Sequence, residues 1–128
     1  MRIRFRIGKV EVFGELKGTP TAKKVLEALP FDSKAQTWGE EVYFPAPVRV
    51  NLEADAKQVV DPGTVCFWTE GNCLALPFGP TPISKGTECR LVDKCNILGK
   101  LEGDPTILCR VRDGDVIRVE AAGGLNKT

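Results

Sequence analysis

The sequence predicts a mainly β protein in which eight short strands close into a barrel capped by one or two helices. Three observations support this prediction. Short segments alternate apolar and polar residues along most of the chain, as half-buried strands do. Two apolar runs flank a Gly-containing turn within residues 64–78, which is typical of a hairpin. A clear helical stripe occurs only near residues 19–30.

The chain opens with a strand in which arginine and large apolar residues alternate over residues 2–7. One face of this strand is therefore basic and the other apolar. Gly8 and Lys9 favour a tight turn, and Val10 and Val12 continue the alternation beyond it. We expect an opening β-hairpin.

A helix is predicted next. Thr19 can accept hydrogen bonds from the first free backbone N–H groups, and Pro20 suits the first helical position. Pro30 ends the helix. The apolar positions follow helical spacing: Ala22, Val25, Leu26 and Leu29. We expect this helix to cover an open end or face of the sheet.

The stretch from residue 36 to residue 53 again favours strands. Pro45 and Pro47 interrupt it, which indicates an edge or a bulge. Beyond them, residues 48–52 alternate apolar and polar side chains, and this predicts that the strand resumes. Residues 54–61 are mixed in character and predict a turn region.

The second half of the chain predicts more short strands. The hairpin at 64–78 turns at Glu70-Gly71-Asn72. The segments that follow are a loop at 79–87, extended stretches at about 88–92 and 95–101, a short helix at 105–110, a turn at Asp113-Gly114, a last strand at 116–120 and a frayed tail at 121–128. With no repeat and no linker, we expect a single domain over residues 1–128.

Composition excludes several classes of partner. The 128 residues carry a net charge of +1 with Lys and Arg spread along the chain, which disfavours nucleic acid and anionic membranes. No window approaches the roughly 18 apolar residues of a membrane-spanning helix, and the N-terminus lacks the apolar run of a signal peptide. We expect a soluble cytoplasmic protein. The single Met and nine prolines favour a heat-stable protein from a thermophile.

The chain has no histidine and five cysteines: Cys66, Cys73, Cys89, Cys95 and Cys109. It therefore lacks the commonest neutral metal ligand, and no cysteines form the close pair typical of structural zinc. We expect neither a metal nor another cofactor. Buried free thiols and one or more disulfides both remain open. Cys66 and Cys73 flank the hairpin turn and are the nearest pair for a bond.

The order of these segments resembles the small cyclophilin-like domain family of bacteria and archaea, which is mostly of unknown function. The similar segments are TAKKVLEALPF (21–31), TWGEEVYFPAPVRV (37–50), VVDPGTVCFWTEGNCLALPFGPTPIS (59–84), CNILGKL (95–101) and RDGDVIRV (112–119). The resemblance implies an eight-stranded cyclophilin-type barrel with helices capping its ends. It transfers no catalytic residue, because the FHRxIxxFxxQGG-like motif of prolyl isomerases has no counterpart here.

Two functions are compatible with these residues. A peptidyl-prolyl cis–trans isomerase needs an apolar seat for proline and a donor, usually a guanidinium, that stabilises the twisted amide. Arg49 and Arg90 are the candidate catalytic donors. Apolar neighbours on both sides make each of them more typical of a solvated strand residue than of a catalytic donor.

The favoured function is a non-catalytic binding module for a peptide or small ligand. Aromatic side chains are concentrated in a short part of the chain, and those that escape burial would form a groove. The candidate ligand-binding residues are Trp38, Tyr43, Phe44, Trp68 and Phe78. The expected partner is a proline-containing peptide or a small apolar ligand.

Two other kinds of catalysis are disfavoured. A cysteine nucleophile would lack the neighbouring histidine that usually forms the thiolate. Glu40 and Glu41 are adjacent in a predicted strand, so they point to opposite faces and cannot act as an acid–base pair. We expect both carboxylates to be surface charge.

Overall fold

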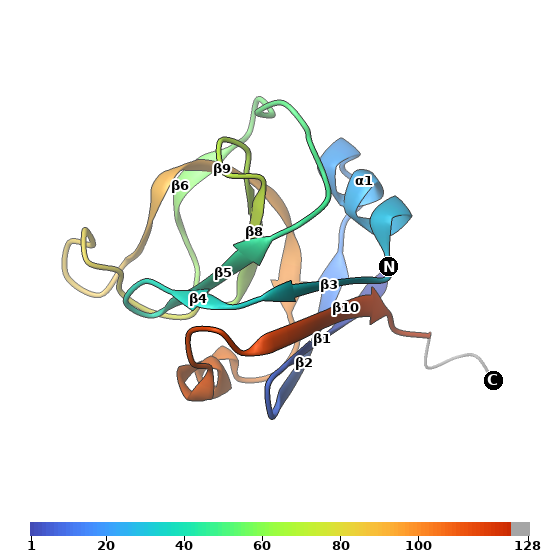
Figure 1. Cartoon of the computed structure of the whole chain (residues 1–128). Coiled ribbons are helices and arrows are strands. Elements are labelled where there is room, and N and C mark those ends of the chain that lie inside the picture. Colours follow the sequence, from blue (N-terminus) through green and yellow to red (C-terminus); the bar gives the residue numbers. More distant parts are fainter. Residues whose placement is uncertain (124–128) are drawn as a thin grey trace.

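A computed structural model of the chain describes residues 1–123, and these fold into a nearly closed antiparallel barrel (Figure 1). The elements are, in chain order, β1 (Arg2–Ile7), β2 (Val10–Leu16), α1 (Pro20–Ala28), β3 (Phe31–Lys34), β4 (Gln36–Thr37), β5 (Glu41–Pro45), β6 (Lys57–Val60), β7 (Thr64–Trp68), β8 (Cys73–Pro77), β9 (Cys89–Leu101), the 3₁₀ helix η1 (Pro105–Arg110) and β10 (Val116–Ala121).

The barrel wall is one sheet whose two edges meet in a single chain segment. Hydrogen-bonded neighbours follow the order β3, β10, β1, β2, β9, β7, β8, β5, β4. Only the buried Ala35 separates β3 from β4. Because β3 pairs with β10 and β4 pairs with β5, this segment links the edges. Counting β3 and β4 together, the eight-stranded barrel is confirmed; β6 lies outside the wall and pairs with β9.

The alternation in the opening strand is reproduced in space. Ile3, Phe5 and Ile7 are fully buried, and the Phe5 ring meets the Phe44 ring edge-on with 6.2 Å between centroids. The arginines of the same strand face outward, and Arg2 and Arg4 pair with carboxylates. Arg4 Nη2, for example, lies 2.6 Å from Glu120 Oε2 on the neighbouring strand β10.

Helix α1 begins where the sequence predicts and lies beside one end of the barrel (Figure 1). The Thr19 side chain accepts a hydrogen bond from the backbone N–H of Ala22, 3.1 Å away. Ala22 and Val25 are buried against the core, so the predicted apolar stripe is confirmed. In the part of the chain that the structure describes, no helix is long and apolar enough to cross a membrane.

A buried polar network ties α1 to β9 and to the segment before β6. The amide of Asn96, which is fully buried, donates to Thr21 Oγ1 at 2.8 Å and to the carbonyl oxygen of Asn51 at 3.0 Å. Its oxygen accepts from the backbone N–H of Glu53 at 2.7 Å. The Glu53 carboxylate in turn accepts from the backbone N–H and hydroxyl of Thr21 in the first turn of α1.

This network explains where the sequence prediction was wrong. Residues 46–56 form no strand, because the Asn96 side chain takes backbone groups of this segment that a sheet would need. Residues 57–60 form β6 instead of a turn. The two extended stretches predicted at 88–92 and 95–101 are one strand, β9. The short helix at 105–110 is present as η1, and most of the predicted frayed tail, 124–128, lies outside the described residues.

All five cysteines are free thiols. Cys66 and Cys73 are not bonded, because strand register sets Cys66 opposite Ala75 and Cys73 opposite Trp68. Four of the thiols are buried, whereas Cys109 in η1 is exposed. Of the two alternatives left open by the sequence, free thiols are the one observed, with one thiol on the surface.

The Asn96 network should contribute measurably to stability. Replacing Asn96 by Ala removes three hydrogen bonds and leaves buried partners unsatisfied, so we expect a loss of about 2–3 kcal/mol in the free energy of unfolding. Urea denaturation measures this loss. The control is Asn51→Ala, whose exposed side chain should change stability by less than about 0.5 kcal/mol. Equal stabilities for the two variants would contradict the role given to the network.

The thiols should differ sharply in reactivity. In the native protein we expect a thiol reagent to label Cys109 rapidly and the four buried cysteines slowly, because access limits the reaction. After unfolding, all five should react. Mass spectrometry of the labelled protein gives the count, and Cys109→Ser should abolish the rapid phase. Rapid labelling of a second site in the native state would show that the buried set is wrongly assigned.

Candidate ligand pocket

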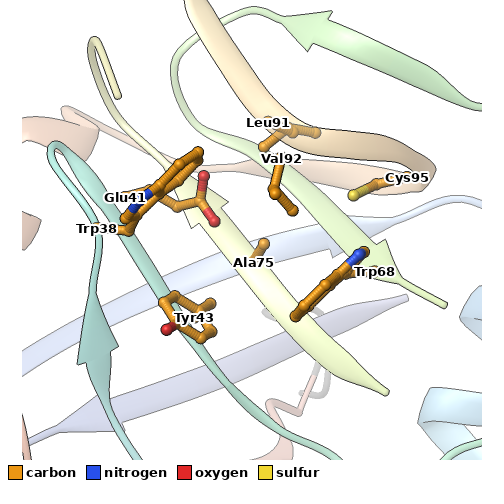
Figure 2. Close-up of a pocket in the computed structure, with 8 residues that line it drawn as sticks. All are labelled: Trp38, Glu41, Tyr43, Trp68, Ala75, Leu91, Val92 and Cys95. Carbon is orange, nitrogen blue, oxygen red and sulfur yellow. The ribbon is translucent and has the colours of Figure 1, made fainter. Parts of the chain in front are cut away.

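The candidate site is a pocket on the outer face of the barrel, between β5, β7 and β8 on one side and the first half of β9 on the other (Figure 2). Its volume is about 190 Å³. A dry cavity of roughly 150 Å³ can hold benzene, so this pocket suits a ligand about the size of one substituted ring. Its lining residues are Trp38, Glu41, Tyr43, Trp68, Ala75, Leu91, Val92 and Cys95.

The pocket exists because β9 is longer than the barrel wall requires. Residues 96–100 of β9 pair with β7 in the wall, whereas residues 89–95 pair with β6 and pass over the outward-facing side chains of β7 and β8. We call this first half of β9, residues 89–95, the arm. The outward-facing side chains of β7 and β8 beneath the arm are consequently buried. Together with residues of the arm they form a second apolar cluster: Cys66, Ala75, Leu91 and Cys95.

Trp68 forms one wall of the pocket and is fixed from two sides. Its Nε1–H donates to Asp93 Oδ2 at 3.2 Å, which joins the end of β7 to the arm. Its ring lies against Gly71 in the hairpin turn, where a Cβ atom would overlap the ring. The glycine is therefore required for the position of the tryptophan.

Trp38 and Tyr43 form the opposite wall. Trp38 lies in the turn between β4 and β5, and its backbone N–H donates to the carbonyl oxygen of Glu41 at 3.0 Å. Tyr43 pairs with Gln36 across the two strands, and its hydroxyl donates to Gln36 Oε1 at 3.0 Å. The backbone contact thus fixes the turn that carries Trp38, and the hydroxyl contact fixes the Tyr43 ring.

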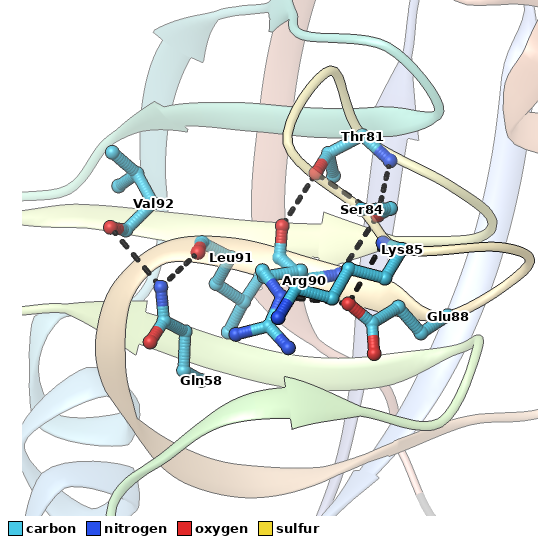
Figure 3. Close-up of polar contacts among 8 residues, drawn as sticks. All are labelled: Gln58, Thr81, Ser84, Lys85, Glu88, Arg90, Leu91 and Val92. Carbon is cyan, nitrogen blue, oxygen red and sulfur yellow. Dashed lines mark hydrogen bonds and ion pairs between the residues drawn. The ribbon is translucent and has the colours of Figure 1, made fainter.

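The arm is anchored at its start by side chains of the neighbouring segments (Figure 3). Gln58 of β6 donates to the carbonyl oxygen of Leu91 at 2.9 Å. On the other side, the Ser84 hydroxyl accepts from the backbone N–H of Arg90 at 3.2 Å, and Thr81 Oγ1 donates to the carbonyl oxygen of Arg90. These contacts fix the position of Leu91 and Val92 in the wall of the pocket.

Glu41 is the polar group of the pocket. Its side chain is only 5% exposed, and Figure 2 shows the carboxyl group pointing into the space between the rings and the arm. Its Oε1 atom is buried and has no hydrogen-bond partner among the described residues. Burial raises the pKa of this carboxyl from 4.5 to about 7. Near neutral pH Glu41 can therefore act either as a donor or as an anionic acceptor.

The thiols around Glu41 are chemically quiet. Burial raises the pKa of Cys95 to about 12 and that of Cys66 well above its usual value. Both are neutral at physiological pH, so neither thiol offers a thiolate to a ligand.

The structure brings together three of the five aromatic residues named from the sequence. Trp38, Tyr43 and Trp68 line the pocket. Phe44 and Phe78 do not, because both are buried in the main core and Phe44 packs against Phe5. Strand alternation separates Tyr43, which faces outward, from Phe44, which faces inward. The two phenylalanines therefore lie outside this pocket.

Neither candidate arginine reaches the pocket. Arg49 is exposed in the irregular segment after β5, beside Pro47 and Val48. Arg90 points away from Leu91, and its Nε lies 2.6 Å from Glu88 Oε2 (Figure 3). The two guanidinium groups therefore do not share a site with the aromatic rings.

Sequence reasoning missed Glu41 and the arm residues. Glu41 was expected to be surface charge, and this is wrong: it shares the outward face of β5 with Tyr43, but the arm covers that face. Glu41 alternates along β5 with Val42 and Phe44, which lie in the core, and this alternation indicated that the Glu41 side chain faces outward. Nothing local indicated that Leu91, 50 positions along the chain, would cover it.

Comparison with known proteins places the chain in a family. A family model described as Cyclophilin-like matches residues 1–120. The chain belongs to the cyclophilin-like family. It is also similar to the solution structure of a hypothetical protein from Archaeoglobus fulgidus, with 36% sequence identity, a TM-score of 0.82 and coverage of 95% of each chain. No curated protein matches it. The fold and family recognised from the sequence are thereby confirmed.

The buried carboxyl of this cyclophilin-like protein should make its stability depend on pH. The folded-state pKa of Glu41 is raised, so the folded protein retains a proton that the unfolded chain releases above about pH 4.5. Stability should fall as pH rises toward 7 and then level off. A shift from 4.5 to about 7 corresponds to about 3 kcal/mol.

The variant Glu41→Gln, neutral at every pH, should match the wild type near pH 4 and exceed its stability by up to about 3 kcal/mol near pH 8. Urea denaturation across this pH range measures the difference. Glu40→Gln removes an exposed neighbouring carboxylate and should keep the wild-type pH dependence. A constant offset between wild type and Glu41→Gln at all pH values would refute the raised pKa.

Proposed function

We propose that this protein is a non-catalytic binding module that takes a small organic ligand with a flat apolar body into the pocket of Trp38, Tyr43 and Trp68. The observation that carries the proposal is the buried Oε1 of Glu41, which lies in an aromatic-lined pocket and has no hydrogen-bond partner among residues 1–123. Buried polar atoms in folded proteins are nearly always hydrogen-bonded. A ligand donor supplies the missing partner.

The shape of the pocket agrees with this function. Rigid aromatic and apolar walls with a small number of polar groups are typical of ligand sites. The rings are fixed by their own hydrogen bonds, from Tyr43 to Gln36 and from Trp68 to Asp93, before any ligand arrives. A preformed site of this kind loses little entropy on binding.

The alternative function, a peptidyl-prolyl isomerase with a non-standard active site, has less support. Isomerase catalysis needs a donor aimed at the twisted amide beside an apolar seat. Arg90 is bound to Glu88 and Arg49 lies on another surface, so neither arginine is near the seat that the aromatic rings provide. The carboxyl that lines this seat is Glu41, whose oxygen would accept or share a proton.

Tryptophan fluorescence tests the binding proposal directly. Titration with benzyl alcohol, a neutral one-ring probe, should change the emission of Trp38 and Trp68 in a saturable way. In Trp38→Leu, which removes one wall, we expect about tenfold weaker binding, read from the remaining Trp68.

The matched control for Trp38→Leu is Phe13→Leu. Phe13 lies on β2 beneath the Arg2 guanidinium, 4.2 Å from ring centroid to Cζ, and does not line the pocket. The affinity of the Phe13→Leu variant for benzyl alcohol should equal that of the wild type. If binding is absent in the wild type, or weakens equally in both variants, the pocket is not the ligand site.

A further inference from the structure

We propose that the ligand of this pocket is a cation: a protonated amine on a compact apolar body, whose N–H group donates to the carboxylate of Glu41. The inference rests on the proposed function, because it names the class of ligand for the same pocket. It follows from the charges, the rings and the unpartnered oxygen taken together.

The first observation is a buried carboxyl with no positive partner. In the part of the chain that the structure describes, no lysine or arginine lines the pocket. On the arm, Arg90 is paired with Glu88 and Lys94 is exposed to solvent. An isolated buried carboxylate is strongly disfavoured, whereas a carboxylate paired with a hydrogen-bonded cation is not. The pocket therefore has room for one positive charge that the protein does not supply.

The second observation is the set of rings beside that carboxyl. The faces of tryptophan and tyrosine carry partial negative charge and attract cations within about 6 Å. Trp38 and Tyr43 stand on one side of the pocket and Trp68 on the other (Figure 2). The Asp93 carboxylate, bonded to Trp68 Nε1, adds negative charge at the rim. Every polar feature of the pocket thus favours a positive ligand over an anion.

The third observation separates amines from quaternary ammonium ions. Oε1 of Glu41 is buried, and no donor among the described residues reaches it. A protonated amine has N–H groups that satisfy this oxygen, whereas a quaternary ammonium ion has none. Leaving a buried acceptor unsatisfied weakens binding. The geometry therefore favours a protonated amine.

Cation binding should be linked to the ionisation of Glu41. The titratable groups that face it are Tyr43 on its own strand, Cys66 of β7, and Cys89 and Cys95 of β9. The pKa of each of these groups is raised, so all four stay neutral at pH 6–8. On β8, Cys73 shares the outward face with Ala75, and burial raises the pKa of its thiol, so it also stays neutral. Glu41, with a pKa of about 7, is the group that changes charge in this range.

The experiment compares four probes that share one benzyl body: benzylamine, benzyl alcohol, benzoate and benzyltrimethylammonium. Isothermal titration calorimetry on the full chain at pH 8 gives their affinities. We expect benzylamine to bind at least tenfold more tightly than benzyl alcohol. Benzoate should bind most weakly, and benzyltrimethylammonium should bind more weakly than benzylamine.

The variant Glu41→Gln removes the charge and keeps the shape. The affinity of this variant for benzylamine should fall at least tenfold, and by more than its affinity for benzyl alcohol, because the alcohol carries no charge that the carboxylate would attract. Glu40→Gln is the matched control and should bind both probes as the wild type does. For the wild type, benzylamine affinity should rise about tenfold from pH 6 to pH 8, with proton release at the lower pH, because Glu41 must ionise.

The outcomes separate the two proposals. If benzyl alcohol binds and benzylamine binds no more tightly, or if Glu41→Gln leaves the preference unchanged, the inference about charge is overturned and the binding function stands. Tightest binding of the quaternary probe would overturn the role of the N–H group. If no probe binds, the pocket is not a ligand site and both proposals fail.

Discussion

The barrel wall and the pocket both depend on the path of one strand, β9. Its second half completes the wall between β2 and β7, and its first half leaves the wall to cover the outer face. The change of direction coincides with a shift in the register of β7 and β9 between Val65 and Cys66, as at a β-bulge. Gly99 sits at the same place, where a Cβ atom would collide with the carbonyl oxygen of Glu15 on β2.

The position of the arm is fixed by polar contacts rather than by apolar packing alone. Asn96 anchors the bend to α1 and to the segment before β6, while Gln58 and Ser84 hold the start of the arm. A strand held at both ends can keep Leu91 and Val92 at a fixed distance from Trp68. The pocket is consequently built before a ligand enters, and the energetic cost of ordering it belongs to folding.

The wall could be predicted from sequence because its information is local. Alternation in residues 2–7, the Thr19 cap and the turn at Gly71 each specify structure within a few residues. The arm could not, because it depends on contacts between distant segments: Asn96 takes the backbone of residues 51–53, which otherwise alternate as a strand would. The same limit explains the candidate site, in which aromatic residues were found but the burial of Glu41 was missed.

The contrast between Glu41 and the other charges argues that this carboxyl is present for a ligand. On the opposite part of the barrel, charged side chains are paired: Arg2 with Glu102 and Arg4 with Glu120. Glu41 is more buried than any of these. Among the described residues, Arg4 Nε and Glu41 Oε1 are both buried without a hydrogen-bond partner, but Arg4 forms ion pairs through its other nitrogen atoms. An apolar side chain in place of Glu41 would avoid the cost of burying a polar group. Residues that lower the stability of the fold are concentrated at functional sites. A carboxyl group surrounded by aromatic rings is suited to binding a positively charged nitrogen, whereas it does not stabilise the fold.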